Sequence, residues 1–244
     1  METRSSEYGE LCIGSRDELF QLKADLILEV AQREAVQTAT VALTGGSTPK
    51  VWYAWVCQQA ALASLDPGRV TWSVSDERHV PLSSEDSNFG NAQRALLDPL
   101  KILPEHQRPW PVEQTPIKAA RDFLAAWRRD FGPARAFHLC FVGMGDDGHT
   151  LSLFPGCLDA ARSNLPFAAI EIPGKGWRLT LTPAGLGLCD TIVPLVLGRA
   201  KASRLRQVFE GRYNPDQQPI QILREHATRT RWLIDHEAAS ELSV

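Results

Sequence analysis

The sequence predicts an α/β protein whose mostly parallel sheet carries helices on both faces. Short apolar segments alternate with longer amphipathic segments along the chain, and this order is typical of the strands and helices of a parallel sheet. The segment 136–142 (AFHLCFV) is continuously apolar, which predicts a strand that is covered on both sides. Four of the predicted strands end in polar or glycine-rich clusters. Because ligands of open α/β sheets bind beyond the carboxyl ends of the strands, these clusters are the candidate site.

Each element is predicted from its apolar pattern and its caps. We expect helices over 15–39, from the TGGSTP turn to about 62, over 87–97 and 115–130, and from GRAKA to about 209, with a last helical turn at 236–240. We expect strands over 40–44, 69–75, 136–142, 167–172, 177–182, 192–197 and 228–235, of which 167–172 and 177–182 form a hairpin-like excursion. Ser47 or Thr48 is expected to cap the second helix, with Pro49 in its first position, and Ser87 and Asn88 to cap the third.

The composition indicates a single folded domain over residues 1–244, with a smaller excursion near 158–182. A chain of 244 residues, of which 43% are hydrophobic and 23% charged, can bury a large core without disulfides or metals. Intrinsic disorder and low complexity are excluded. The seven tryptophans are expected to be core residues.

Charge and cysteine usage restrict the partners and the compartment. The 26 basic and 29 acidic residues give a net charge of −3, which argues against a broad nucleic-acid surface but permits a small anion in a local pocket. The five cysteines are widely spaced and form no CxxC pair, which is typical of reduced thiols. The N-terminus lacks the apolar stretch of a signal peptide, and no uncharged apolar run approaches about 18 residues. We therefore expect a cytoplasmic protein without a membrane partner.

The segment TGGSTP is a candidate anion site. Gly45 and Gly46 allow a ligand to approach the backbone closely, and the helix that begins behind them presents free N–H groups. Gly45, Gly46, Ser47 and Thr48 are therefore candidates to bind a phosphate. An ordinary capped turn is the alternative. A Walker loop is excluded because GxxxxGK[ST] is absent.

The segment GMGDDG (143–148) matches the dinucleotide pattern GxGxxG, but its context does not fit that function. Asp146 and Asp147 would repel a pyrophosphate, and Pro155 comes too soon for the long helix that should follow. A Mg²⁺ site on the two aspartates is a weak alternative because adjacent side chains seldom point the same way. The chain has no His and Cys spacing typical of a zinc site.

His149 follows this loop and is a candidate general base. It lies among glycines and acids at a strand end, and Asp147, two residues before it, can fix its tautomer and raise its basicity. A purely structural histidine is the alternative. His138, inside an apolar strand, is expected to be structural.

Two basic residues are candidates to bind an anionic ligand. Arg78 lies in DERHVP, and Lys201 in GRAKA lies near a helix N-terminus, where the helix dipole disfavours a cation unless an anion is nearby. For Lys201, a solvated surface position is the alternative. Asp76 is expected either to act as an acid or base or to orient Arg78, and Glu77 to form an ion pair.

In this order, these motifs resemble the glucosamine-6-phosphate isomerase/6-phosphogluconolactonase family, and in particular its 6-phosphogluconolactonases. The similar segments, which span about residues 40–240, are TGGSTP, DERHVP with SNFGNAQRALL, GMGDDGHTLSLFPG, RLTLTPAGL, VPLVLGRAKA and WLIDHEAA. The chain departs from the family at Leu151, where a small residue is usual, at 173–177, where a proline-rich segment is usual, and at 219–222.

The resemblance implies a Rossmann-like fold shared with glucosamine-6-phosphate deaminases and ribose-5-phosphate isomerases. It implies hydrolysis of 6-phospho-D-glucono-1,5-lactone to 6-phospho-D-gluconate, the second step of the oxidative pentose phosphate pathway, with no metal or organic cofactor. We expect His149 to activate water, Asp147 to orient it, and Arg78, Lys201 and the TGGSTP turn to hold the phosphate. Asp76 is included among the catalytic candidates, and the protein is expected to be a monomer or a weak homo-oligomer.

Two other functions stay open at this point. A glucosamine-6-phosphate deaminase would use an acid at Asp76, but that family has DGHxAFNEP where this chain has DGHTLSLFPG, so the glutamate that assists ring opening is missing. A non-catalytic sugar-phosphate sensor is the second alternative. The intact Asp147 and His149 argue against it.

Overall fold

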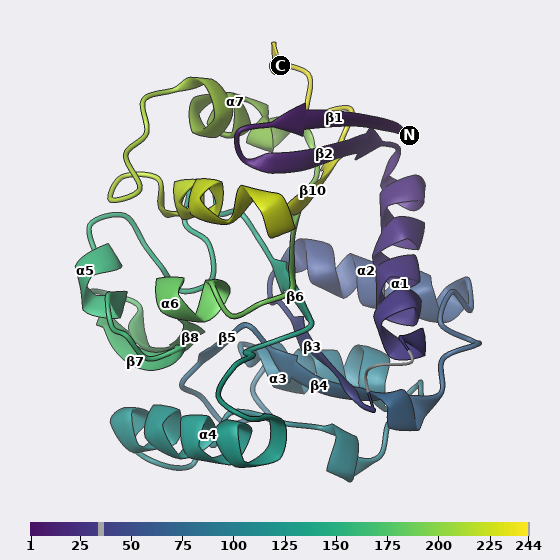
Figure 1. Ribbon diagram of the computed structural model, residues 1–244, viewed down its shortest axis with the longest axis vertical. Helices are drawn as coiled ribbons and strands as arrows, with labels where there is room; N and C mark the ends of the chain where they lie inside the picture. The colour runs from purple at the N-terminus through teal and green to yellow at the C-terminus, as the bar shows by residue number, and fades with distance from the viewer. Residues whose placement is uncertain (34–36, 244) are drawn as a thin grey trace.

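A seven-stranded sheet forms the centre of the protein, whose computed structural model describes residues 1–33 and 37–243 (Figure 1). Within these residues the strand order is β1-β2-β10-β9-β6-β3-β4. The strands are β1 (Glu2–Ser6), β2 (Gly9–Gly14), β3 (Ala39–Leu43), β4 (Val70–Val74), β6 (Leu139–Val142), β9 (Thr191–Val196) and β10 (Arg231–Asp235). Neighbouring strands are parallel except for β1, which runs antiparallel to β2 at the edge. The predicted mostly parallel sheet is confirmed.

A smaller sheet lies beside the larger one, and part of it was not expected. It has the order β5-β8-β7, with β5 (Asp76–Arg78), β7 (Phe167–Ile172) and β8 (Gly176–Leu181). The hairpin of β7 and β8 is the predicted excursion. The start of DERHVP, predicted as a loop, instead forms β5 and pairs antiparallel with β8.

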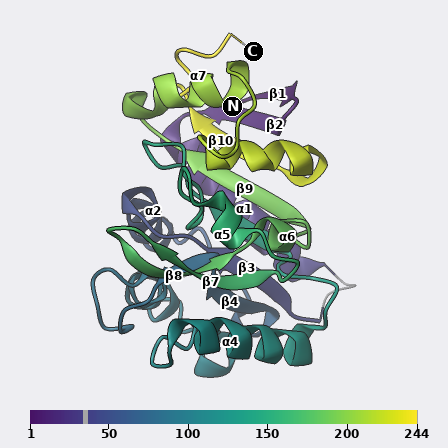
Figure 2. The same cartoon turned by 90° about the vertical axis from the view of Figure 1, so that its left-hand side faces the viewer.

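Helices cover both sides of the larger sheet (Figures 1 and 2). On one side lie α1 (Arg16–Gln32) and α2 (Ser47–Gln58), and on the other lie the smaller sheet and α6 (Pro183–Leu186). The remaining helices are α3 (Asn88–Ala92), which continues as a π-helical turn (Gln93–Leu97), α4 (Pro116–Phe131), α5 (Leu158–Ala161) and α7 (Ala202–Glu210). None of the described helices is long and apolar enough to cross a membrane.

The first helix is shorter than predicted. It begins with a capping box, in which Ser15 and Glu18 satisfy each other's backbone N–H groups, but it ends at Gln32 rather than at residue 39. The Arg69 side chain donates hydrogen bonds to the carbonyl oxygens of Ala31 and Arg33, at 2.9 and 3.1 Å. It thereby satisfies carbonyl groups that a longer helix would use. Residues 34–36 of the predicted helix lie outside the described residues.

Other differences arise where the sequence pattern is polar or irregular. The hairpin of β1 and β2 was not predicted, because β1 is a polar edge strand without an apolar face. Two short 3₁₀ helices, separated by a kink at His226, occupy Pro219–Arg229, so the last strand starts at Arg231 and not at 228. Residues 236–240 form turns and not a regular helix, but the Ala239 N–H donates to the Asp235 carbonyl oxygen at 2.9 Å, which is the hydrogen bond of a single helical turn. The Asp235 carboxylate accepts the N–H of Ala238, as the first residue of a helical turn does.

Aromatic side chains fill the space between the smaller sheet and α4. The Trp110 and Phe123 rings stack with centroids 4.1 Å apart, and Phe167 meets Phe123 edge-on at 5.0 Å. Five of the seven tryptophans are buried in the core, as expected, whereas Trp55 and Trp177 are only partly buried. His138 is buried, and the Thr40 backbone N–H donates to its Nδ1 at 3.0 Å, which supports the predicted structural role. Burial lowers the pKa of His138 to about 4. All five cysteines, each within the described residues, are free.

Glu77 anchors the start of α3 and does not form the predicted ion pair. Its buried carboxylate accepts the Ser87 hydroxyl at 2.9 Å and the backbone N–H groups of Asn88 and Phe89 at 2.7 and 2.8 Å. It also accepts the backbone N–H of Arg78 at 2.8 Å. Ser87 is the N-cap of α3, as predicted, because its hydroxyl accepts the Gly90 N–H. Glu77 therefore fixes the loop that joins β5 to α3.

Replacing Glu77 by glutamine tests this role. The amide would retain one acceptor oxygen but would place donors against N–H groups, so we expect Glu77→Gln to lower the free energy of unfolding by about 2–3 kcal/mol. Urea denaturation measures the change. Glu85→Gln, at an exposed position in the same loop, is the matched control, and its urea midpoint should equal that of the wild type. Equal midpoints for both variants would contradict the assignment.

Candidate active site

A cavity of about 360 Å³ opens at the carboxyl ends of β3, β6 and β9. Thr44, Gly143 and Leu197 line it, and each follows directly after one of these strands. From β3 the chain crosses to β4, whereas from β6 it crosses to β9 on the opposite side. The cavity therefore lies at the switch point of the sheet, where ligands of such folds bind.

The start of α2 contributes free N–H groups to this cavity. The helix begins at Ser47, one residue after Gly46, whose φ of 111° is readily adopted only by glycine. The prediction of a Ser47 or Thr48 cap with Pro49 in the first position was wrong, because Gly46 is the N-cap and no side chain caps the helix. The first-turn N–H groups thus remain available to a bound anion.

Gly45 is needed because another side chain occupies the space beside it. A Cβ at this position would come within 1.8 Å of the Asn88 Oδ1 atom. Asn88 in turn donates to the Asp76 carbonyl oxygen at 2.9 Å. Asn88 therefore contacts both Gly45, in the turn after β3, and Asp76, in the segment after β4, and it holds the two segments together.

His149 and Asp147 form a hydrogen-bonded pair. The distance from His149 Nδ1 to Asp147 Oδ1 is 2.6 Å, and the His149 backbone N–H donates to the same oxygen at 3.0 Å. Burial opposes ionisation of Asp147, but these hydrogen bonds outweigh it and lower the pKa of this carboxyl group. Because an ionised carboxylate only accepts, Nδ1 is the donor in this hydrogen bond, which leaves Nε2 as the ring nitrogen that can act as a base. The imidazole stacks on Phe154 with centroids 4.3 Å apart.

Asp76 lies in the same cavity and is buried. The Ser152 hydroxyl donates to its Oδ2 at 2.7 Å. Burial raises the pKa of Asp76, although Ser152 and the nearby Arg78 oppose the shift. Arg78 donates to the Asp86 carbonyl oxygen at 2.6 Å. Within the described residues, Asp76 therefore has no hydrogen bond with which to orient Arg78.

Arg178 is a site residue that the sequence analysis missed. It lies directly opposite Arg78 in the antiparallel pairing of β5 with β8, and both line the cavity. Burial and the charge of Arg78 lower the pKa of Arg178. Like charges directly opposite each other destabilise a strand pair. An arrangement of this kind is consistent with a bound anion that offsets the repulsion.

Lys201 reaches the cavity from the N-cap of α7. Its ammonium group donates to the Met144 carbonyl oxygen at 2.9 Å and to Asp146 Oδ1 at 2.5 Å. The hydrogen bond from Lys201 lowers the pKa of Asp146. Asp146 thus faces Lys201, while Asp147 faces His149. No cluster of three or more potential metal-ligating side chains occurs among the described residues.

Leu151 occupies a strained position at the cavity wall. Its φ of 55° lies in the left-handed region, which is costly for a residue with a side chain. The side chain is buried and lines the cavity. This departure from the family therefore lies in the wall of the cavity.

Most of the residues predicted for the site come together. The predicted residues that line the cavity are Gly45, Gly46, Ser47, Thr48, Asp76, Arg78, His149 and Lys201. Asp147 does not line it but holds His149. The basic residues that were missed are Lys23, Lys175 and Arg178. The sequence signal for Arg178 is its position at the start of the predicted strand RLTLT. The signal becomes useful only when DER is also predicted as a strand, because Arg178 then lies opposite Arg78.

Comparison with known proteins agrees with this geometry. The family model described as glucosamine-6-phosphate isomerases/6-phosphogluconolactonase matches residues 14–232. The 6-phosphogluconolactonase of a Synechocystis strain is 31% identical over 208 residues, which are 83% of this chain and 84% of that protein. The 6-phosphogluconolactonase of Homo sapiens is 32% identical over 241 residues, which are 92% and 91% of the two chains.

The fold is also found among solved structures. The structure of 6-phosphogluconolactonase from Trypanosoma cruzi has a TM-score of 0.81 at 24% identity, and covers 100% of this chain and 99% of that one. The family model covers most of the sequence, including every motif of the cavity. The chain therefore belongs to the glucosamine-6-phosphate isomerase/6-phosphogluconolactonase family.

Proposed function

We propose that this protein hydrolyses 6-phospho-D-glucono-1,5-lactone to 6-phospho-D-gluconate, the second step of the oxidative pentose phosphate pathway. The observation that carries the proposal is the 2.6 Å contact of Asp147 with His149 at the edge of a cavity rimmed by cations. Such a site combines a base with a receptor for a phosphorylated ligand. The named activity of the relatives supports the same reaction.

Opening a lactone requires a water nucleophile and stabilisation of the charge that develops at C1. His149 Nε2 accepts a proton from water as the oxygen attacks the carbonyl carbon, and Asp147 stabilises the resulting imidazolium. Backbone N–H groups of the glycine-rich loops hold the oxyanion. When the ring C–O bond breaks, the departing oxygen takes up a proton. Asp76, whose pKa is raised by burial, is suited to supply it.

The phosphate group is held at the cationic side of the cavity. It carries a charge of about −1.5 to −2 at neutral pH. Arg78 and Arg178 face it from neighbouring strands, Lys201 approaches from α7, and the first turn of α2 presents N–H groups. These groups orient the substrate so that C1 comes near His149.

The two alternative functions are less well supported. The DGHTLSLFPG segment places Leu151 and Ser152, rather than a glutamate, beside Asp76 and His149. A deaminase would therefore lack its acid for ring opening. A non-catalytic sensor has no need of the Asp147–His149 contact, whereas a hydrolase does.

The direct test is an assay of lactone opening on freshly prepared 6-phosphogluconolactone, with the spontaneous reaction subtracted. The wild type should accelerate opening, and His149→Ala should lower kcat by about 10²–10⁴-fold while the affinity for 6-phosphogluconate changes little. A near-normal kcat in the variant would remove His149 from the role of base. Ammonia release from glucosamine 6-phosphate by the wild type would instead favour the deaminase.

Two glycines of the GMGDDG loop offer a matched comparison. A Cβ on Gly145 would come within 2.0 Å of His149 Nδ1 and 2.8 Å of Asp147 Oδ1, whereas a Cβ on Gly143 would have nothing within 4 Å. We expect Gly145→Ala to lower kcat at least about tenfold, since a displacement of the base by about 1 Å is costly. Gly143→Ala changes the cavity lining without a contact to the His149–Asp147 pair, so it should lower kcat less than Gly145→Ala does. Equal activities of the two variants would show that the position of the pair does not matter.

Arg178→Met tests the phosphate site. Loss of a charge-assisted hydrogen bond should raise KM about ten- to hundredfold, with a smaller effect on kcat. The melting temperature without ligand should be unchanged or higher, because the variant removes the repulsion between Arg178 and Arg78. Arg121→Met, on the exposed face of α4, is the control. An unchanged KM for Arg178→Met would place the phosphate elsewhere.

A further inference from the structure

Lys23 is a buried lysine at the cavity, outside all of the motifs described above. It lies on the apolar face of α1, one turn after Leu19 and one turn before Ile27, and only 1% of it is exposed. It is nevertheless one of the residues that line the cavity. Lysines are almost never fully buried without a partner, so this position requires an explanation.

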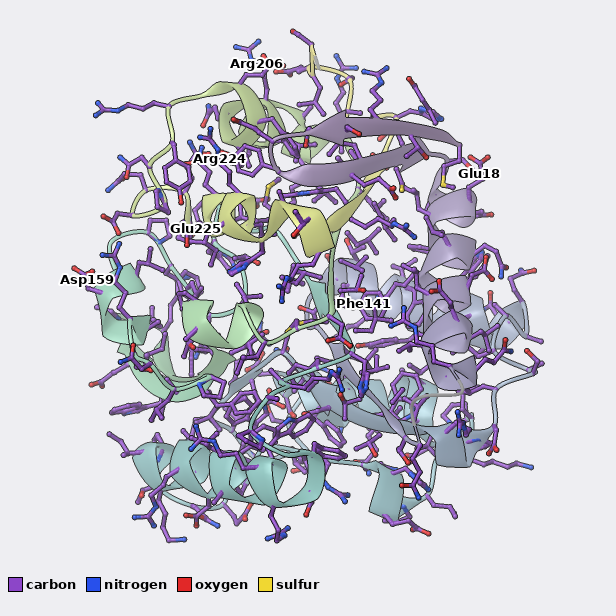
Figure 3. All side chains as sticks on the ribbon, in the orientation of Figure 1. Glu18, Phe141, Asp159, Arg206, Arg224 and Glu225 are labelled. Atoms are coloured by element: carbon purple, nitrogen blue, oxygen red, sulfur yellow. The ribbon has the colours of Figure 1, made fainter. Side chains whose placement is uncertain are left out.

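The Lys23 ammonium group contacts aromatic rings and no acid. Nζ lies 4.0 Å from the centroid of the Trp52 ring and 4.4 Å from that of Phe141. Figure 3 shows Phe141 in the interior, between β6 and α1. Among the described residues, neither an ion pair nor a hydrogen bond reaches Nζ. Burial lowers the pKa of Lys23 to about 7. The rings favour the cation, but they cannot replace a counter-ion.

The position of Trp52 relates Lys23 to the start of α2. Trp52 lies one turn after Thr48, and helical side chains lean towards the N-terminus of their helix. The ring that contacts Lys23 Nζ therefore lies beneath the first turn of α2, where the free N–H groups are. Lys23 and these N–H groups belong to the same wall of the cavity.

We propose that Lys23 determines specificity for a phosphorylated ligand. It becomes fully protonated when the phosphate group binds, and it holds that group from the cavity wall formed by α1 and the first turn of α2. The proposal rests on the proposed function, because it takes the ligand to be a phosphorylated sugar acid or its lactone. Lys23 would then differ from Arg78, Arg178 and Lys201, whose charges are present before the ligand arrives. It would couple phosphate binding to the uptake of a proton.

The surroundings of Lys23 allow this coupling to be measured. Its neighbours on α2 and β6, Trp52 and Phe141, do not titrate. The charged or titratable side chains that share the cavity are Asp76, Arg78, His149, Lys175, Arg178 and Lys201. Because the phosphate itself also exchanges protons near neutral pH, the contribution of Lys23 is the difference between matched variants.

The sign of the pH dependence follows from linkage. Without ligand Lys23 loses its proton as the pH rises through about 7, whereas the bound anion holds the protonated form. Affinity is therefore greatest below this pH and decreases above it, approaching tenfold per pH unit. If Lys23 only fills space in the core, it should not contribute to the change of affinity with pH.

The experiment is calorimetric titration of the full chain with 6-phosphogluconate, in buffers of different ionisation enthalpy, between about pH 6 and 9. We compare the wild type with Lys23→Met, which has a similar length without the amine. Lys118→Met, which removes an exposed lysine from α4, is the control. Lys23→Met should weaken binding about ten- to hundredfold at low pH, and the difference should shrink towards pH 9. The wild type should take up about 0.4–0.8 more protons than the variant near pH 8.

Stability separates this role from a structural one. Lys23→Met removes a desolvated amine, so its melting temperature without ligand should equal or exceed that of the wild type. Equal affinity and equal proton uptake in the two proteins would overturn the proposal. If the variant does not fold, the wild type alone gives the test. A wild-type affinity for 6-phosphogluconate that does not decrease above about pH 7 would also overturn the proposal. Should the wild type neither bind 6-phosphogluconate nor open the lactone, the proposed function fails first. If it does both, only the role of Lys23 is at stake.

Discussion

The passage of the chain from one sheet to the other at Ser75 is the constraint on which the site depends. The Ser75 N–H donates to Leu43 of β3 at 2.7 Å, and its carbonyl oxygen accepts the Leu181 N–H of β8 at 2.9 Å. The next three residues form β5, so that Asp76 and Arg78 enter the cavity while Glu77 is buried against α3. Alternation of side chains along a strand produces this division. One short strand thus supplies an acid and a cation to the site, and an anchor to the fold.

The site gathers more positive charge than the folded chain can neutralise. Arg78 and Arg178 oppose each other across two strands, and Lys23 lies in the interior without an acid. Lys201 has Asp146, but that acid is on the solvent side. Concentrating cations in this way costs stability, and the proposed dianionic ligand would offset that cost. The net charge of −3 is therefore a surface average that hides a local reversal of sign.

The sequence was sufficient for the elements with a clear pattern and for residues next to strand ends. The strands β3, β4, β6 and β9 are mostly apolar and almost entirely buried. The four segments that follow predicted strands contain all of the predicted site residues. The sequence was insufficient where contacts between distant parts of the chain determine the local structure. Arg69 ends α1 from a distant position in the chain, and β5 is a strand only because β8 lies beside it. Lys23 could have been suspected as a lysine on an apolar helix face, but only the cavity gives that position a meaning.

The two aspartates of the GMGDDG loop show how adjacent residues take separate tasks. Asp146 turns to Lys201 and keeps it beside the loop, whereas Asp147 receives both the side chain and the backbone N–H of His149. A dinucleotide loop would need both positions free of charge, since a pyrophosphate would lie against them. In this chain the acids are directed away from the cavity towards their own partners. The same glycine pattern therefore places the His149 imidazole in a cavity that is also lined by cations, and this combination suits hydrolysis of a phosphorylated ester better than binding of a nucleotide.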